Sequence, residues 1–164
     1  MSSTIVIGAG QAANAFIAKL RALGDQRPIT LIGEEPVPPY QRPPLSKAYL
    51  KGDMALERLY LRPEAWYAEQ GVILRLGARA EAVDTGARTV RVGDATLPYD
   101  DLILTTGSVP RRLPVTIGGD LAGVHVVRSL ADVDAMAPEM QPGRHVLVVG
   151  GGYIGLEAAA VAAT

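Results

Sequence analysis

The sequence predicts an α/β protein with two Rossmann-like units, and three observations lead to this prediction. A short β-branched segment runs into the glycine turn Gly8-Ala9-Gly10, and a helical pattern follows at once. A second apolar segment runs into Gly150-Gly151-Gly152, again with a helical pattern directly after it. The two turns lie too far apart in the sequence for a solenoid repeat, so they indicate two separate modules.

The first module begins with a β-α-β pattern. We expect a strand at Thr4–Ile7, a helix at Ala12–Leu23 and a strand at Ile29–Ile32, a segment about as long as one βαβ unit. Five prolines between Pro36 and Pro44 exclude regular structure there, because proline lacks the backbone N–H that helices and sheets use. A helical pattern resumes at Leu45–Leu50.

Short strands and helices alternate through the rest of the chain. Strands are expected at Val72–Leu76, Ala80–Val83, Thr89–Val92, Thr96–Leu97, Leu102–Leu104, Val124–Val127 and Val146–Val149, and helices at Glu64–Gln70, Asp132–Met140 and Gly155–Thr164. The Gly93-Asp94 pair predicts a hairpin turn, and Leu102–Leu104 is expected to be a buried strand.

A proline-flanked segment from Pro110 to Pro114 is expected to be a hinge, so we divide the chain into residues 1–112 and 113–164. The last helical pattern has no C-cap and no strand after it, although a crossover helix normally leads into a parallel strand. We therefore expect the second module to be incomplete in this chain, as in a fragment.

Composition and charge narrow the class of protein. Sixteen basic residues are balanced by seventeen acidic ones, which argues against a nucleic-acid partner. No apolar stretch approaches the ~20 residues that span a bilayer, and the start of the chain lacks the charged region of a signal peptide. There is no cysteine, and His125 and His145 are far apart, so we predict no metal site and a cytoplasmic protein without a membrane partner.

The first glycine turn has the pattern of a dinucleotide site. Gly8 permits the tight turn, and Gly10 removes the side chain that would keep the backbone away from a pyrophosphate. The N–H groups at the start of the following helix would then face the phosphates. Ala13 occupies the third position, which is usually glycine, and Glu34 follows the second strand where a ribose-binding acid is expected. The alternative for Glu34 is a solvated loop residue.

The second turn, from Gly150 to Gly155, contains all three glycines of the pattern directly after an apolar strand. Two such sites imply two dinucleotides, most economically FAD and a nicotinamide nucleotide, unless one of the turns only serves packing. A further signal is Thr106-Gly107 after a predicted strand, where the backbone could approach a cofactor, although packing explains it at least as well.

Beyond these turns, the chain resembles the FAD-dependent NAD(P)H:ferredoxin reductases of oxygenase systems, of the putidaredoxin, rhodocoxin and biphenyl dioxygenase reductase type. This group belongs to the pyridine nucleotide-disulfide oxidoreductase superfamily but lacks its disulfide. The resemblance covers the whole chain and rests on GAGQAA, PPYQRPPLSKAYL, LYLRP, Thr106-Gly107, VRSL and GGGYIGLEAAAVA. The PPYQRPPLSKAYL string is the most discriminating, because no simple fold constraint demands it.

The resemblance implies a set of binding residues. Those implied for FAD are Gly8, Gly10, Gln11, Ala12, Ala13, Glu34, Arg42, Lys47, Ala80, Thr106, Gly107 and Arg128. Those implied for NAD are Gly150, Gly151, Gly152, Tyr153, Ile154, Gly155 and Glu157. Lys47 would lie beside the flavin ring as a fixed cation, and no general base is expected. Thr105 replaces a common alanine before Thr106-Gly107, which we expect to be neutral.

Disulfide reductases of this plan have a cysteine pair after the second strand, where this chain has the cysteine-free segment Pro44–Leu50. The resemblance therefore implies electron transfer from NADH or NADPH through FAD to a [2Fe–2S] ferredoxin that serves a cytochrome P450 or a Rieske-type ring-hydroxylating oxygenase. The alternatives are an NADH oxidase or nitrite-reductase-type flavoprotein, and an apoptosis-inducing-factor-like FAD protein.

Overall fold

The computed structural model describes residues 3–164, which form two compact units. Of the described residues, the first unit contains 3–41 and Tyr60–Gly107, and the second contains Arg42–Leu59 and Ser108–Thr164. The segment 42–59 thus belongs with the later part of the chain. The sequence-based boundary near residue 112 remains a prediction, and each unit is described by itself below.

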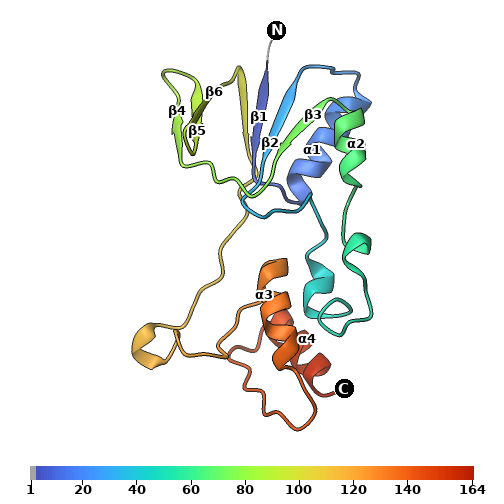
Figure 1. Cartoon of the computed structure of the whole chain (residues 1–164), viewed down its shortest axis with the longest axis vertical. Coiled ribbons are helices and arrows are strands. Elements are labelled where there is room, and N and C mark those ends of the chain that lie inside the picture. Colours follow the sequence, from blue (N-terminus) through green and yellow to red (C-terminus); the bar gives the residue numbers. More distant parts are fainter. Residues whose placement is uncertain (1–2) are drawn as a thin grey trace. The chain divides into compact units, whose positions relative to one another are not determined.

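A four-stranded parallel sheet forms the centre of the first unit (Figure 1). Its strands are β1 (Thr4–Ile7), β2 (Ile29–Ile32), β3 (Val72–Arg75) and β7 (Asp101–Leu104), in the order β3-β2-β1-β7. All three pairings are parallel, and the segment between β1 and β2 contains a helix, as in a βαβ unit, whereas the chain passes from β3 to β7 through three antiparallel strands. The predicted α/β fold class is confirmed.

The two helices of this unit cover one face of the sheet (Figure 1). Helix α1 (Gln11–Ala22) and helix α2 (Glu64–Glu69) pack through Ile17 and Tyr67 onto Val6 and other apolar residues of the strands. Successive side chains of a strand point to opposite faces, so Val6 faces these helices while its neighbours face away.

The opposite face is covered by a small antiparallel sheet. Its strands are β4 (Ala82–Asp84), β5 (Thr89–Val92) and β6 (Ala95–Pro98), and the last two form the predicted hairpin. Val90 of this sheet packs against Ile5 and Ile7 of β1. The parallel sheet is thus held between helices and a second sheet, which fixes its strand ends.

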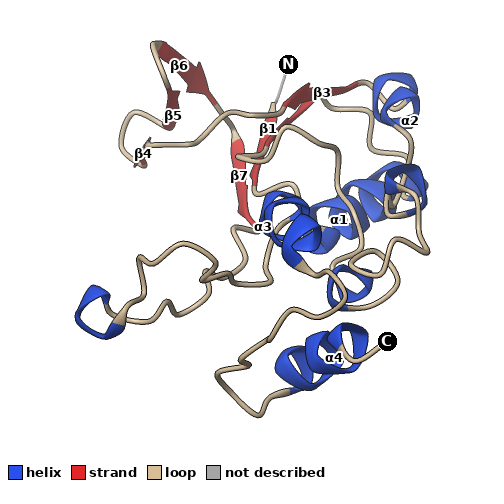
Figure 2. Cartoon of the chain, turned by 60° about the horizontal axis from the view of Figure 1, so that its bottom comes forward, coloured by secondary structure: helices blue, strands red, loops and turns tan. Residues whose placement is uncertain are grey.

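The second unit is helical and contains no strand among its described residues. A 3-10 turn at Pro43–Ser46, helix α3 (Leu130–Met136) and helix α4 (Tyr153–Ala162) form its centre, and the 3-10 turn packs against both helices. Three more 3-10 turns occur at Leu56–Arg58, Val115–Ile117 and Ala137–Glu139. Between β7 and α3 the chain is loop except for the turn at Val115–Ile117 (Figure 2).

Several expected elements differ in the structure. Val124–Val127 and Val146–Val149 were expected to be strands, but neither pairs with a strand in the described residues, and Leu147 is 88% exposed. β-branched sequence alone does not make a strand, because a strand needs a hydrogen-bonded neighbour. The expected helix at Leu45–Leu50 is instead the 3-10 turn at Pro43–Ser46, which begins at two prolines.

The expectation that Leu102–Leu104 is buried is also wrong. Strand β7 lies at the edge of the sheet, and the side chain of Leu104 is 64% exposed. An apolar run is typical of a strand but does not show whether that strand lies in the centre or at the edge of a sheet. In the part of the chain that the structure describes, no helix is both long and apolar enough to cross a membrane.

Thr4 provides a test of the core. Its side chain is 2% exposed, and the hydroxyl has no hydrogen-bond partner among the described residues. We expect Thr4→Val to raise the free energy of unfolding by about 1 kcal/mol, because it replaces a buried unsatisfied hydroxyl by a methyl group of the same shape. Thermal or denaturant unfolding would measure the change, with the exposed Thr96→Val as control. A loss of stability in Thr4→Val would show that the hydroxyl has a partner.

Candidate functional site

Three parallel strands of the first unit end at the same level. Ile7 of β1 lies opposite Ile32 of β2 on one side and opposite Leu104 of β7 on the other. The residues that follow therefore meet at one edge of the sheet. Ligands of open α/β sheets bind outside this edge, at the carboxyl ends of the strands. The register thus brings together the predicted FAD residues that follow these strands, namely Gly8, Gly10, Glu34, Thr106 and Gly107.

The backbone of the first turn is packed too closely for a side chain. Gly8 has φ +102°, a conformation that favours glycine, and a Cβ there would lie 2.2 Å from the carbonyl oxygen of Thr105. A Cβ at Gly33, directly after β2, would lie 2.5 Å from the Cβ of Ala9. Both glycines permit the turn to lie directly against the neighbouring strand ends.

The helix that follows the turn begins without a side-chain cap. Gly10 is the N-cap of α1, and a Cβ built on Gly10 would have no atom within 4 Å. The N–H groups at the start of an α-helix have no partner inside the helix, and here no capping side chain satisfies them. The turn from Gly10 through Gln11 and Ala12 is therefore open and electropositive, which fits a diphosphate group. Ala13 is fully buried in the core, so its methyl group packs between helix and sheet.

Glu34 has a partner that the sequence analysis missed. The guanidinium of Arg79 lies 3.0 Å from a carboxylate oxygen of Glu34, and both side chains are exposed. The predicted adenine-contacting residue Ala80 is the next residue after Arg79 and packs against the core formed by Ile5, Ile7 and Val90. Arg79 is thus the ion-pair partner of the predicted ribose-binding acid, and its place beside Ala80 was the only sequence signal for this.

The second glycine turn has the same features of backbone geometry. Gly150 has φ +116°, and a Cβ on Gly155 would lie 2.6 Å from the carbonyl oxygen of Gly150. Gly152 is the N-cap of α4 without a side-chain cap, and Cβ atoms on Gly150, Gly151 and Gly152 would meet open space. Tyr153 begins the helix. The turn and helix of the predicted site are present, but the strand expected before them is a loop.

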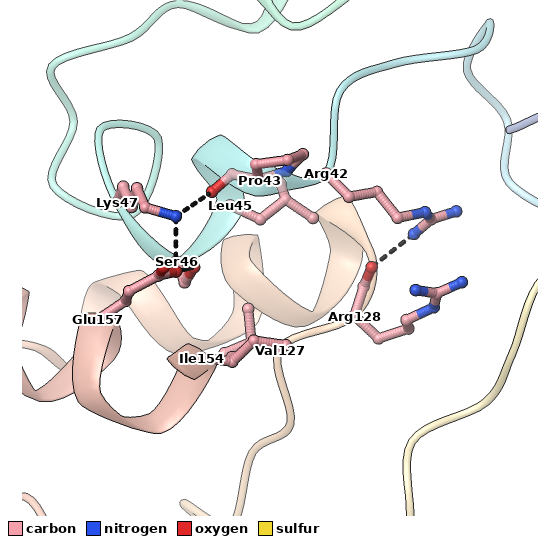
Figure 3. A pocket seen from close by; sticks show the side chains of 9 residues that line it. All are labelled: Arg42, Pro43, Leu45, Ser46, Lys47, Val127, Arg128, Ile154 and Glu157. Carbon is pink, nitrogen blue, oxygen red and sulfur yellow. Dashed lines mark hydrogen bonds and ion pairs between the residues drawn. The ribbon is translucent and has the colours of Figure 1, made fainter. Parts of the chain in front are cut away.

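A cavity of about 310 Å³ lies within the second unit. It brings together predicted residues of both nucleotides: Arg42, Lys47 and Arg128 from the FAD set, and Ile154 and Glu157 from the NAD set. Figure 3 shows the two guanidinium groups at one end of the cavity and Lys47 with Glu157 at the other. Pro43, Leu45, Ser46 and Val127 complete the lining.

An ion pair fixes the Lys47 end of this cavity. The Lys47 ammonium lies 2.7 Å from a carboxylate oxygen of Glu157 and donates to the carbonyl of Pro43 at 3.2 Å. The hydroxyl of Ser46 donates to the same Glu157 oxygen at 2.6 Å. The hydrogen bonds from Lys47 and then Ser46 hold the pKa of the Glu157 carboxyl below its ordinary value. Glu157 was predicted in the NAD site from the glycine-rich motif, and nothing in the sequence indicated that Ser46 contacts it.

The arginine end of the cavity is held through the backbone. Arg42 donates a hydrogen bond from its guanidinium to the carbonyl oxygen of Arg128. Ser129 caps α3 through a reciprocal pair of hydrogen bonds with Asp132, which fixes the chain directly after Arg128. The VRSL motif therefore places Arg128 beside Arg42.

The histidines are not part of these sites. His125 lies 3.1 Å from a carboxylate oxygen of Glu139. Within residues 3–164, no group of three histidine, cysteine, aspartate or glutamate side chains could hold a metal ion.

Comparisons with known proteins decide the family. The family model described as pyridine nucleotide-disulphide oxidoreductase matches residues 2–164. The chain belongs to this family. Among curated members, it is 46% identical over 162 residues to the ferredoxin–NAD(+) reductase component of the anthranilate 1,2-dioxygenase system of Burkholderia cepacia, covering 96% of this chain and 39% of that protein. It is 43% identical to rhodocoxin reductase of Rhodococcus erythropolis, covering 98% of this chain and 38% of that protein.

Solved structures in the family agree with the fold. The reductase in the covalent putidaredoxin reductase–putidaredoxin complex superposes with a TM-score of 0.91 at 38% identity, over 99% of this chain and 40% of that chain. The chain thus spans about two fifths of the length of these relatives. The predicted membership in this group of flavoprotein reductases is confirmed, whereas the roles of individual residues stay predictions.

Gly8 and Gly10 form a matched pair for testing the turn. We expect Gly8→Ala to lower the free energy of unfolding by at least ~2 kcal/mol, because its Cβ would overlap the Thr105 carbonyl in a positive-φ conformation. Gly10→Ala should lower it by less than about 1 kcal/mol, since its Cβ meets open space and only the N-cap preference for glycine over alanine is lost. Denaturant unfolding of both variants measures this. Equal stabilities would contradict the described packing.

The Glu157 pair predicts a pH dependence of stability. A carboxyl whose pKa is lowered in the folded state adds stability above its unfolded pKa, and this is lost as the pH falls through the lowered value. The ordinary pKa of the Glu157 carboxyl is 4.5. When the pH falls below this value, we expect the unfolding temperature of the wild type to decrease more steeply than that of Glu157→Gln. The exposed Glu57→Gln serves as control and should follow the wild type. A Glu157→Gln profile parallel to the wild type would exclude the pair as a source of stability.

Proposed function

We propose that this chain binds FAD and a nicotinamide dinucleotide as part of a flavoprotein oxidoreductase. In this proposal electrons pass from NADH, or from NADPH, to a [2Fe–2S] ferredoxin that serves a cytochrome P450 or a ring-hydroxylating oxygenase. The protein would act in the cytoplasm.

The observation that carries the proposal is the edge where β1, β2 and β7 end. The turn from Gly8 to Gly10 lies between two strand ends, and the uncapped helix α1 starts from it. Open space beside Gly10 allows an anion to reach main-chain N–H groups directly. Glu34, at the end of the neighbouring strand, would accept hydrogen bonds from the adenosine ribose. These residues fit the dinucleotide half of FAD.

The cavity of the second unit supports a role for Lys47 beside the flavin. Bound FAD would accept two electrons from the nicotinamide and release them singly. A cation held by Glu157 and the carbonyl of Pro43 keeps its position, so it can stabilise negative charge that develops beside it without reorganising. Arg42 and Arg128 supply two further cationic groups, which suit the phosphates or the ring edge of the cofactor.

The nicotinamide nucleotide would bind at the second turn. The glycines from Gly150 to Gly152 are open and precede the uncapped start of α4. This is the arrangement that favours a pyrophosphate, as in the first unit. Residues that choose between NADH and NADPH follow the second strand of such a module. Of the two nucleotides, we favour NADH, because these relatives are named as ferredoxin–NAD(+) reductase components.

The electron acceptor is proposed from two facts. The chain contains no cysteine, so its own residues provide no disulfide to reduce. Relatives that are 41–46% identical are named as ferredoxin–NAD(+) reductase components of dioxygenase systems. An external one-electron acceptor is consistent with both.

Gly10→Ala tests the FAD proposal directly. The added methyl group would occupy the open space beside the turn, so we expect FAD to bind at least tenfold more weakly while the fold stays intact. Titration followed by flavin fluorescence measures the dissociation constant, and far-UV circular dichroism monitors folding. If the wild type binds FAD and Gly10→Ala binds it with the same dissociation constant, the cofactor lies elsewhere.

Turnover experiments distinguish the acceptors. The FAD-loaded protein would be mixed with NADH or NADPH, and cytochrome c reduction would be followed with and without a [2Fe–2S] ferredoxin. Rates that depend on the ferredoxin support the proposal. Oxygen consumption at the same rate without the ferredoxin would instead indicate an NADH oxidase.

A further inference from the structure

The side chain of Thr105 contacts the glycine turn that follows β1. Thr105 comes directly after β7, and its backbone N–H donates to the carbonyl oxygen of Ile7 at 2.8 Å. Its hydroxyl lies 2.8 Å from the carbonyl oxygen of Gly8 and 3.1 Å from that of Ile7. The side chain thus extends the pairing of β1 and β7 by one peptide group into the turn.

Two consecutive peptide groups of the turn are thereby held. The peptide between Ile7 and Gly8 is fixed on both sides, because its carbonyl accepts from Thr105 and its N–H donates to the carbonyl of Ile32 at 2.8 Å. The peptide between Gly8 and Ala9 is held at its carbonyl by the Thr105 hydroxyl. A trans peptide is planar, with C=O and N–H pointing in opposite directions. The N–H of Ala9 therefore points away from Thr105.

This contact needs both residues. The absence of a side chain on Gly8 allows the approach, since a Cβ there would lie 2.2 Å from the Thr105 carbonyl oxygen. Glycine also leaves the turn conformationally permissive, so a peptide beside it can rotate unless something holds it. An alanine at position 105 would keep the backbone N–H that bonds to Ile7 but would provide no donor for the Gly8 carbonyl.

We propose that Thr105 is a positioning residue for the diphosphate of FAD. Its hydroxyl fixes the peptide after Gly8, and through it the direction of the main-chain N–H groups that lead into α1. This inference rests on the proposed binding of FAD at the first turn. It also replaces the expectation that threonine at this position is neutral, because the hydroxyl makes contacts that alanine cannot make.

The test compares Thr105→Val, which keeps the shape but loses the donor, with Thr105→Ser, which keeps the donor. Thr4→Val is the matched control, because it removes a β1 hydroxyl that has no partner among the described residues. Dissociation constants for FAD, ADP and adenosine would be measured by fluorescence titration and competition. ADP contains the diphosphate, whereas adenosine lacks it.

We expect Thr105→Val to weaken binding of FAD and ADP about three- to tenfold, the effect of one hydrogen bond. Binding of adenosine should change less than twofold, and Thr105→Ser and Thr4→Val should stay within about twofold of the wild type for all three ligands. If Thr105→Val does not fold, Thr105→Ala makes the same comparison.

Three results would overturn the inference while FAD binding stands. Wild-type affinities in the valine or alanine variant would show that the hydroxyl positions nothing. An equal loss for ADP and adenosine, or an equal loss in Thr105→Ser, would indicate a general effect on the fold. Absence of FAD binding in the wild type would reject the proposed function itself. The wild-type measurement is made before any variant is compared, so the two failures can be told apart.

Discussion

The register of three parallel strands is the constraint on which the first candidate site depends. Ile7 is aligned with both Ile32 and Leu104, so the chain leaves all three strands at one level. Shifting one pairing by a residue would turn its side chains to the other face and move its strand end out of the group. The register is held because β1 is buried on both faces, by Val6 toward the helices and by Ile5 toward the antiparallel sheet. Core packing therefore determines where a dinucleotide can approach the backbone.

Sequence patterns predicted the first unit well because local and tertiary preferences agree there. β1 and β2 have the expected bounds, and the glycine turn has the conformation that its sequence indicates. The second unit was predicted less well. Val146–Val149 has strand composition but no neighbouring strand in the described residues, and pairing is the part of strand formation that composition does not encode. The expected helix at Leu45–Leu50 is likewise a 3-10 turn at Pro43–Ser46 followed by turn residues.

The site residues also include some that the sequence predicts and others that it does not. Glycine positions follow from backbone geometry and can be inferred from spacing, as at Gly8 and Gly155. Contacts between side chains that are distant in sequence cannot be inferred from spacing. The contacts of Arg79 with Glu34 and of Ser46 with Glu157 were overlooked for this reason. Glu157 shows the consequence most clearly. Its place in the glycine-rich motif suggests the nicotinamide nucleotide, whereas its partner in the structure is the lysine predicted for the flavin.

The path of the chain between the two units has a practical consequence. The polypeptide passes from one unit to the other after Gln41, after Leu59 and after Gly107, so each unit is assembled from two separate stretches of sequence. A protease that cuts at a single one of these passages would not release two independent bodies. It would leave two fragments that together form at least one folded unit, so they should copurify under native conditions and separate only in denaturant.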